Sequence, residues 1–232
     1  MFPLHDDQPR FSTPFVTYFL IAFNVVIYLF ESMLQFQSPH ALAQLVTQFG
    51  VVPRHEVALL TGTPVFNPVA ALLPMFTSMF LHGSWLHVLG NMWMLWIFGD
   101  NIEDYLGHFL YLVFYLLCGL AAAFTHILFN VASLAPTIGA SGAIAGVMGA
   151  YLVLYPHARV LVWIIIPLYV PAWLMLGWWA VTQFVNGAAT TAAVTSQQGG
   201  IAFWAHVGGF VVGILLIKLL PQRKQRYRYS SW

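Results

Sequence analysis

The sequence predicts an all-α membrane protein, built as a bundle of six transmembrane helices, from three observations. Of its 232 residues, 60% are hydrophobic and only 6% are charged, whereas a soluble domain carries about 25% charged residues. The apolar residues gather in segments of roughly the length that crosses a bilayer. The basic residues fall almost entirely on one side of those segments. The surface of this chain is therefore expected to face lipid.

A helix that crosses the bilayer needs roughly 20 mostly apolar residues. Segments that meet this requirement lie at about 14–31, 84–99, 108–129, 139–155, 160–181 and 201–220. The fourth segment is short and rich in glycine. The fifth contains Pro167 and Pro171, and each proline removes a backbone donor. We therefore expect the fifth segment to be a kinked helix that its neighbours hold weakly.

The basic residues orient the bundle. Under a six-span topology Arg10, Arg159, Lys218 and the arginine-rich stretch 223–228 share one side, and Arg54 lies on the other. Because positive residues are enriched in cytoplasmic loops, both termini are expected in the cytoplasm. The expected organisation is an N-terminal cytoplasmic segment (1–13), a membrane domain (14–220) and a basic cytoplasmic tail (221–232) that meets anionic lipid.

The outward-facing loops of this topology differ in character. Residues 32–83 form a long loop in which 41–52 and 69–81 are apolar enough to lie at the interface as short helices. Residues 182–200 are small, polar and uncharged, and they are expected to form a flexible cap. This cap and the fifth segment are the candidates for a moving gate.

Cysteine usage and the start of the chain give further bounds. The single cysteine, Cys118, excludes a disulfide framework and disfavours a cysteine-built metal site. The first residues carry Asp6 and Asp7 and lack a basic region, so a cleaved signal peptide is not expected. Without an extra domain or a transit peptide, the chain is expected in a bacterial inner membrane. No nucleic-acid partner is expected, and the oligomeric state is left open.

Polar residues inside a bilayer are expensive, so each of them is a candidate for function. His87, Asn91, Ser141 and His206 lie near the starts of the second, fourth and sixth segments, which run in the same direction. These four side chains are therefore expected at similar depth, in the outer third of the membrane. His87 and Asn91 are four residues apart and share one helix face.

Glycine spacing predicts which helices meet. Gly142 and Gly146 form one ridge of small residues, and Gly209 and Gly213 form another. Such ridges let two helix backbones approach closely in a membrane. The fourth and sixth segments are therefore expected to pack together and to bring Ser141 within hydrogen-bond reach of His206.

With these motifs in this order, "HGSWLHVLGN", "GASG" and "AHVGG", the sequence resembles the rhomboid family of intramembrane serine proteases. The resemblance implies that Ser141, in Gly139-Ala140-Ser141-Gly142, is the nucleophile and that His206 is the catalytic histidine. It implies that His87 and Asn91 form the family's His-x-x-x-Asn pair. It further implies that His82 lines the site, and that Glu103 and Gly107 belong to the cytoplasmic turn after the second span.

Two positions depart from the common pattern of the family. Many members carry a Trp-Arg pair in the first outer loop, where this chain has Leu73 and Pro74. Many also carry an aromatic residue four positions after the serine, packed on the histidine, where this chain has Ala145. Another group must then hold the ring of His206, and Phe203 and Phe210 are the candidates.

The expected chemistry is peptide hydrolysis by a Ser-His dyad. His206 would take the proton of Ser141, and no carboxylate is placed to orient it, because the acidic residues at 100–104 lie at the opposite membrane face. The Asn91 amide, His87 and the backbone N–H of Ser141 would stabilise the oxyanion. By resemblance the substrate is a transmembrane helix of another protein, and neither metal nor organic cofactor is used.

Several alternatives remain beside this reading. The chain could be an inactive rhomboid-like protein that binds transmembrane segments, although its serine and histidine are intact. The chain could also be a transporter, which would be expected to show repeats and a polar site at the midplane. The sequence shows no repeat, and its polar residues lie nearer the outer face. His82, His87 and His206 could hold zinc, but no metalloprotease motif is present.

Two further polar features have structural interpretations. A lone histidine, His126, is expected to be a packing group, and "GDNIED" at 99–104 is expected to be a solvated turn.

Overall fold

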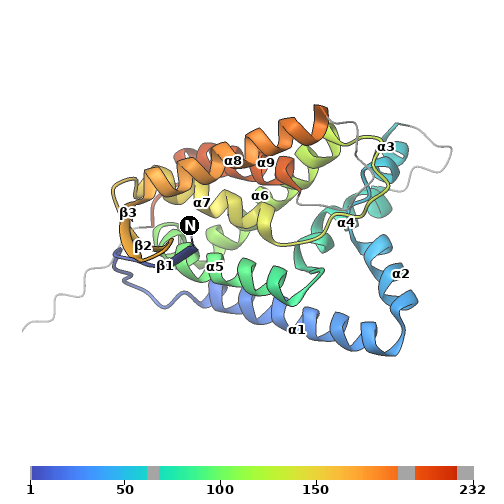
Figure 1. Ribbon diagram of the computed structural model, residues 1–232, viewed down its shortest axis with the longest axis horizontal. Coiled ribbons are helices and arrows are strands. Elements are labelled where there is room, and N and C mark those ends of the chain that lie inside the picture. Colours follow the sequence, from blue (N-terminus) through green and yellow to red (C-terminus); the bar gives the residue numbers. More distant parts are fainter. Residues whose placement is uncertain (1, 62–67, 193–201, 224–232) are drawn as a thin grey trace, which may run out of the picture.

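The computed structural model describes residues 2–61, 68–192 and 202–223 of the chain. Its longer helices run alongside one another as a bundle (Figure 1). These helices are α1 (Phe15–Gln37), α5 (Trp85–Leu106), α6 (His108–Phe129), α7 (Ser141–Leu154), α8 (Ala172–Ala192) and α9 (Phe203–Leu219). The expected all-α bundle is present, together with a small β-sheet that the sequence pattern did not predict.

Five of the six expected segments coincide with helices of the bundle. The segment 108–129 matches α6 at both ends, whereas α1 continues six residues beyond the expected end at residue 31. Among the described residues, α1 and α6 are long and apolar enough to cross a membrane, and α7 and α9 are shorter apolar helices.

Helix α7 occupies the centre of the bundle. Its residues from Gly142 to Tyr151 are all buried, and it packs against α5, α6 and α9. A helix that is apolar on every side is expected to be enclosed by neighbours. By contrast, α1 at the edge exposes Phe15, Phe19 and Phe30, as expected of a surface that meets lipid.

The prediction of a helix for the fifth segment is wrong over 160–171, whereas its remainder, 172–181, belongs to α8. Residues 159–171 form a hairpin of β2 (Arg159–Trp163) and β3 (Pro167–Pro171), and α8 begins directly after it. β-branched residues and a tryptophan fill the run "VLVWIII", and these residue types favour strands. Neither proline has an N–H to donate to a helix or to a strand ladder. Both lie at the ends of β3, an edge strand, where proline is tolerated.

The expectation of a flexible cap at 182–200 is wrong for its first part, because α8 continues to residue 192. Residues 182–192, expected to be part of a flexible loop, are the last turns of α8. The remainder of that expected loop, 193–200, lies outside the described residues. Alanine, threonine and asparagine are compatible with a helix that continues an apolar one, so the polar composition of this stretch did not mark a helix end.

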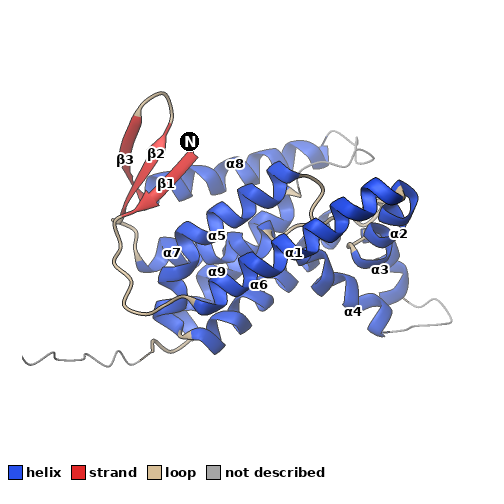
Figure 2. Cartoon of the chain, turned by 90° about the horizontal axis from the view of Figure 1, so that it is seen from below, coloured by secondary structure: helices blue, strands red, loops and turns tan. Residues whose placement is uncertain are grey.

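The sheet joins the start of the chain to the start of α8. Strand β1 (Phe2–Asp6) pairs antiparallel with β2, which pairs antiparallel with β3. Figure 2 shows the three strands together at one corner of the bundle, beside the beginning of α8. The hydroxyl of Tyr151 in α7 donates to the carboxylate of Asp6, which fixes the sheet to the bundle core.

Residues near both ends of the described chain, Phe11 and Arg223, bind the same end of α5. The backbone N–H of Phe11 donates to Asp104, and the N–H of Arg223 donates to the carbonyl of Tyr105. Most of the expected basic tail, residues 224–232, lies outside the described residues.

The segment "GDNIED" is not a solvated turn. It forms part of α5, and the carboxylate of Glu103 is fully buried. Glu103 accepts the backbone N–H groups of Val16 and Thr17 at 2.9 and 2.8 Å and the Thr17 hydroxyl at 2.8 Å. A negative charge at a helix N-terminus is stabilised by the exposed N–H groups there. Gly107, at φ 78°, makes the turn that separates α5 from α6.

The segment between α1 and α5 contains short helices, at the end of the bundle away from the sheet (Figure 1). They are α2 (Pro39–Phe49), α3 (Pro53–Leu60), α4 (Pro68–Thr77) and a 3-10 turn, η1 (Ser78–Phe80). The two expected interface helices at 41–52 and 69–81 correspond to α2 and α4, and α3 was not predicted. Leu73 and Pro74 lie within α4.

Candidate active site

Ser141 and His206 make a direct contact across two helices. Ser141 is the first residue of α7 and His206 lies in the first turns of α9. The Oγ atom of Ser141 and the Nε2 atom of His206 are 2.7 Å apart, which is a good hydrogen-bond distance. The predicted proximity of these two side chains is therefore confirmed, while their chemical roles stay predictions.

Glycines bring the two helices to this distance. A Cβ atom added to Gly209 would collide with the backbone carbonyl of Gly142, and one added to Gly213 would collide with that of Gly146. Only a residue without a side chain allows backbones to approach so closely. The two predicted glycine ridges thus face each other, and they hold α9 against the beginning of α7.

Gly139 places the loop before Ser141 against α5. Its φ of 128° is a conformation that favours glycine. A Cβ atom here would lie 2.7 Å from Nε2 of His87 and 3.7 Å from Nδ2 of Asn91. The backbone N–H of Gly139 donates to the carbonyl of Ser78 at 2.8 Å. The loop therefore brings the serine beside His87 and Asn91, as the similar depth of these residues predicted.

Asn91 is held by a histidine that is itself anchored to α1. Nδ2 of Asn91 and Nε2 of His82 are 3.0 Å apart, and the backbone N–H of His82 donates to the buried carboxylate of Glu31, 3.1 Å from Oε2. His82 and His87 also meet edge to face, with ring centroids 5.1 Å apart. An amide nitrogen has two protons, so one N–H of Asn91 is left for another acceptor.

These residues line a cavity of about 480 Å³. His87 and Asn91 come from α5, Ser141 from α7 and His206 from α9, while α8 forms the facing wall. The wall residues of α8 are Met175, Trp178, Trp179 and Thr182. Phe2 and Pro3 of strand β1 also line it. The cavity has the mostly apolar wall and few polar groups that are typical of a ligand site.

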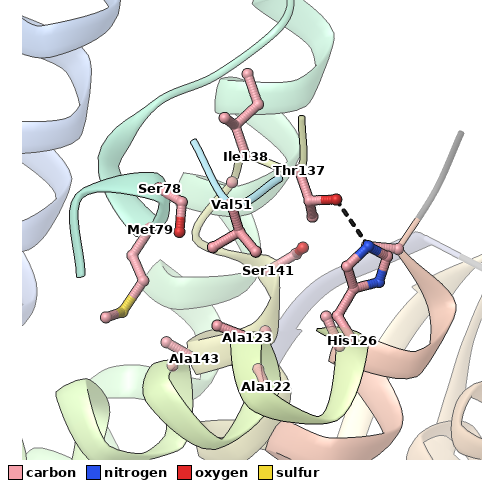
Figure 3. A pocket seen from close by; sticks show the side chains of 15 residues that line it. Val51, Ser78, Met79, Ala122, Ala123, His126, Thr137, Ile138, Ser141 and Ala143 are labelled. Carbon is pink, nitrogen blue, oxygen red and sulfur yellow. Dashed lines mark hydrogen bonds between the residues drawn. The ribbon is translucent and has the colours of Figure 1, made fainter. Parts of the chain in front are cut away.

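A second, small cavity of about 30 Å³ lies on another side of Ser141. Figure 3 shows Ser78, Thr137 and His126 around it. His126, expected to be a packing group, also has a polar partner that the sequence did not reveal, because its Nε2 atom lies 2.8 Å from Oγ1 of Thr137. Thr137 belongs to the loop that leads to Ser141, a relation that the sequence of α6 alone could not show.

The imidazole of His206 is held by residues that were not predicted. Its Nδ1 atom lies 2.7 Å from Oε1 of Gln183, and the ring of Trp179 is tilted against it at 5.7 Å between centroids. The expected contacts, Phe203 and Phe210, do not take this place, since Phe210 packs on Trp179 instead. Gln183 was overlooked because the polar stretch from 182 onward suggested a loop.

A metal site finds no support in the part of the chain that the structure describes, where no three His, Cys, Asp or Glu side chains gather closely enough to hold an ion. The expectation that this site needs no cofactor stays a prediction. Cys118 is buried beside Gly146, between α6 and α7, where it acts as a small apolar side chain.

Comparison with known protein families identifies the family of this chain. The model of the rhomboid domain matches residues 70–223, which include α5 to α9 and every residue of the Ser141–His206 contact. The chain belongs to the rhomboid family. It is therefore an integral membrane protein of a family whose members are generally intramembrane serine proteases.

This rhomboid is similar to curated proteins from several eukaryotes. It is 28% identical over 68% of its length to "Rhomboid protein 1, mitochondrial" of Saccharomyces cerevisiae, covering 46% of that protein. It is 32% identical over 71% of its length to "Presenilin-associated rhomboid-like protein A, mitochondrial" of Danio rerio, covering 41% of it. A third, "Rhomboid-like protein 11, chloroplastic" of Arabidopsis thaliana, is 27% identical over 63% of this chain and is covered over 51% of its own length.

The chain thus spans about half the length of these relatives or less. Their names place them in mitochondria and chloroplasts, so the comparisons lend no support to the expectation of a bacterial inner membrane. Helix α1 precedes the matched region, yet its Glu31 anchors His82 beside Asn91. The site of this rhomboid therefore depends on a helix outside the part that the family model covers.

Proposed function

We propose that this rhomboid is a serine endopeptidase that hydrolyses peptide bonds in or near transmembrane segments of other membrane proteins. The observation that supports this most directly is the 2.7 Å contact between Oγ of Ser141 and Nε2 of His206, on the wall of a cavity of about 480 Å³. A hydroxyl becomes a good nucleophile when an adjacent base accepts its proton.

The reaction proceeds in two halves. Nε2 of His206 takes the proton of Ser141 while Oγ bonds to the carbonyl carbon of the substrate. The resulting tetrahedral intermediate collapses when His206 gives that proton to the leaving amine, and an acyl-enzyme remains. Water then loses a proton to His206 and attacks the ester, and the proton returns to Oγ of Ser141 as the acid product leaves.

The negative oxygen of each tetrahedral intermediate needs donors. The N–H of Ser141 lies at the start of α7, where the first backbone donors have no intrahelical partner and the helix dipole favours negative charge. The free N–H of Asn91 is the second donor, and the ring of His87, against Gly139, is the third candidate. Together they form the proposed oxyanion hole.

The smaller of the two cavities that Ser141 lines is suited to hold the water that the second half-reaction consumes. Its volume of about 30 Å³ exceeds the roughly 10–15 Å³ that one water molecule needs. Ser78, Thr137 and His126 give its wall polar atoms, and a water there would have hydrogen-bond partners close to the nucleophile.

The proposed substrate is a transmembrane helix that unwinds locally before cleavage. A helical peptide bond keeps its carbonyl in a backbone hydrogen bond, so we expect cleavage near the outer end of the span, at a small residue, in sequences with helix breakers. Helix α8 forms one wall of the cavity and, in place of the expected 182–200 cap, is the proposed gate. Surrounding lipid is the other expected partner.

The topology proposed for this reaction keeps residues 14–220 as one membrane domain with six crossings and both termini in the cytoplasm. The binding of Phe11 and Arg223 to the same end of α5 supports it. For the compartment we propose only an integral, multi-pass location, because the bacterial expectation is not supported by the organelle names of the relatives.

The test reconstitutes the purified protein in liposomes with a labelled single-span substrate. Cleavage by the wild type, its loss in Ser141→Ala and His206→Ala, and labelling of Ser141 by a fluorophosphonate would support the proposal. Cleavage that survives both substitutions would overturn it. Binding of the substrate without cleavage by the wild type would identify an inactive rhomboid-like protein, and loss of cleavage with a chelator would implicate a metal.

A further inference from the structure

The second ring nitrogen of His206 has a partner on α8. Nδ1 of His206 lies 2.7 Å from Oε1 of Gln183, although the two residues belong to different helices. Gln183 is 9% exposed and His206 is 8% exposed. Little water can replace this contact, so the buried ring nitrogen depends on the glutamine for its hydrogen bond.

The neighbours of Gln183 identify which end of its amide faces the histidine. Its Nε2 atom is directed at the carbonyl of Trp179, at 3.4 Å, and at Oγ1 of Thr182, at 3.3 Å. Both of these atoms can accept the amide protons, so the oxygen is the end turned to His206. An oxygen accepts and cannot donate, and the proton of this hydrogen bond must therefore belong to Nδ1 of His206.

A neutral imidazole carries one proton. With that proton on Nδ1, the lone pair of Nε2 faces the hydroxyl of Ser141, which is the arrangement that a general base requires. The opposite tautomer would present an N–H to Ser141 and a lone pair to the oxygen of Gln183. That arrangement would lose one hydrogen bond and would leave the serine without a base.

We propose that Gln183 is a positioning residue for this reaction, which holds His206 in the tautomer and orientation that activate Ser141. The inference rests on the proposed protease function. Gln183 does not touch the reacting atoms and acts through the imidazole. When His206 takes the serine proton, the amide oxygen also stabilises the positive ring, as a neutral group in the place where many serine hydrolases carry a carboxylate.

Trp179 completes the support of the ring. It precedes Gln183 by four residues, so both side chains lie on one face of α8, and its ring is tilted against that of His206. Phe210 packs on the same tryptophan. The position four residues after the serine is Ala145, which is buried and has no ring. Gln183 and Trp179, both from α8, therefore orient the imidazole of His206.

The test measures kcat and KM for cleavage of a single-span substrate in liposomes by the wild type and three variants. Gln183→Met keeps the length of the side chain without an oxygen acceptor. Gln183→Glu keeps an oxygen in the same place. Val185→Ala, at an exposed position of the same helix, is the matched control. Gln183→Leu is a second acceptor-free variant, should Gln183→Met not fold.

We expect Gln183→Met to lower kcat by about ten- to a hundredfold, a part of the total that a general base contributes, with KM changed less than about threefold. Gln183→Glu should regain most of this loss, and Val185→Ala should match the wild type. The selective fall in kcat and the rescue by glutamate separate positioning from packing.

Three results would overturn the inference. Gln183→Met could cleave at the wild-type rate, it could change KM alone, or Gln183→Glu could be as slow as Gln183→Met. Failure of the proposed function is a different result, since in that case the wild type itself does not cleave, or Ser141→Ala cleaves as fast as it does.

Discussion

Gly209 of α9 lies directly against the backbone carbonyl of Gly142 in α7, one residue beyond Ser141. This approach sets the distance between the two helices and with it the 2.7 Å contact of Ser141 with His206. The catalytic geometry proposed here is therefore a consequence of glycine packing.

Gly209→Ala should destabilise the protein and reduce its activity together. The added methyl group has no room against the carbonyl of Gly142, and overpacking of this kind costs about 1–3 kcal/mol. Thermal melting in detergent and cleavage in liposomes would show both effects. Gly177→Ala is the matched control, because a Cβ atom on Gly177 meets nothing within 4 Å. Equal melting temperatures for the two variants would contradict the packing argument.

Removal of both members of the dyad should cost no more than removal of one. Residues that act as a unit in catalysis have non-additive effects. We expect Ser141→Ala, His206→Ala and the double variant to share the same residual rate, at least about 10⁴-fold below the wild type. Single-turnover cleavage measures this. A double variant that is much slower than either single variant would show that the two side chains act independently.

Asn91→Ala should lower kcat by about 10²–10³, the usual cost of one oxyanion donor, with little change in KM. The amide contributes its N–H when negative charge develops on the substrate, and it is already held in place by His82. Steady-state kinetics on the reconstituted enzyme would separate the two constants. An increase in KM at unchanged kcat would assign Asn91 to substrate binding instead.

Glu56 of α3 should make stability depend on pH. Burial raises the pKa of this carboxyl from 4.5 to about 7, and it is only 3% exposed. The folded state therefore holds the proton more tightly than the unfolded state does. Its stabilisation is fully present below about pH 4.5 and is lost as the pH rises through about 7.

Glu56→Gln keeps the neutral form at every pH, so its melting temperature should fall less than that of the wild type between pH 5 and pH 8.5. Asp7→Asn, at an exposed position, should leave the wild-type slope unchanged in this range. Melting curves in detergent at several pH values would test this. Parallel curves for the wild type and Glu56→Gln would refute it.

Glu103→Ala should detach the start of α1 from α5. The buried carboxylate accepts two backbone N–H groups at the first turn of α1 and the hydroxyl of Thr17, and hydrogen bonds to a charged group contribute about 1.5–3 kcal/mol each. We expect faster proteolysis of the segment before Phe15 and a lower melting temperature. Unchanged proteolysis would show that the other contacts of α1 are enough to hold its start against α5.

Much of the bundle was predictable, because crossing a membrane imposes a simple pattern. Length and apolarity located five of the long helices of the bundle, and α6 at both of its ends. Spacing of glycines predicted that α7 meets α9, since small residues at intervals of four have one main use in a membrane. Ser141, His206, His87 and Asn91 could be named because polar groups are rare in such helices.

Other features depend on contacts between distant segments. The hairpin at 159–171 is stabilised by strand β1, more than 150 residues earlier, and no local pattern announces that pairing. Glu103 looks like a loop residue until the start of α1 is placed beside it. Gln183 looks like part of a polar cap until α8 packs against α9.

The sequence by itself determined that this chain is a membrane protein, that α7 packs against α9, and that Ser141 and His206 are brought together. These properties follow from the cost of exposing polar groups and from the space that glycine leaves, and both can be read along the chain. Only the tertiary structure decided what orients His206, what anchors Asn91 and where α8 begins. Those outcomes depend on hydrogen bonds between residues far apart in sequence, whose partners are known only once the helices have packed.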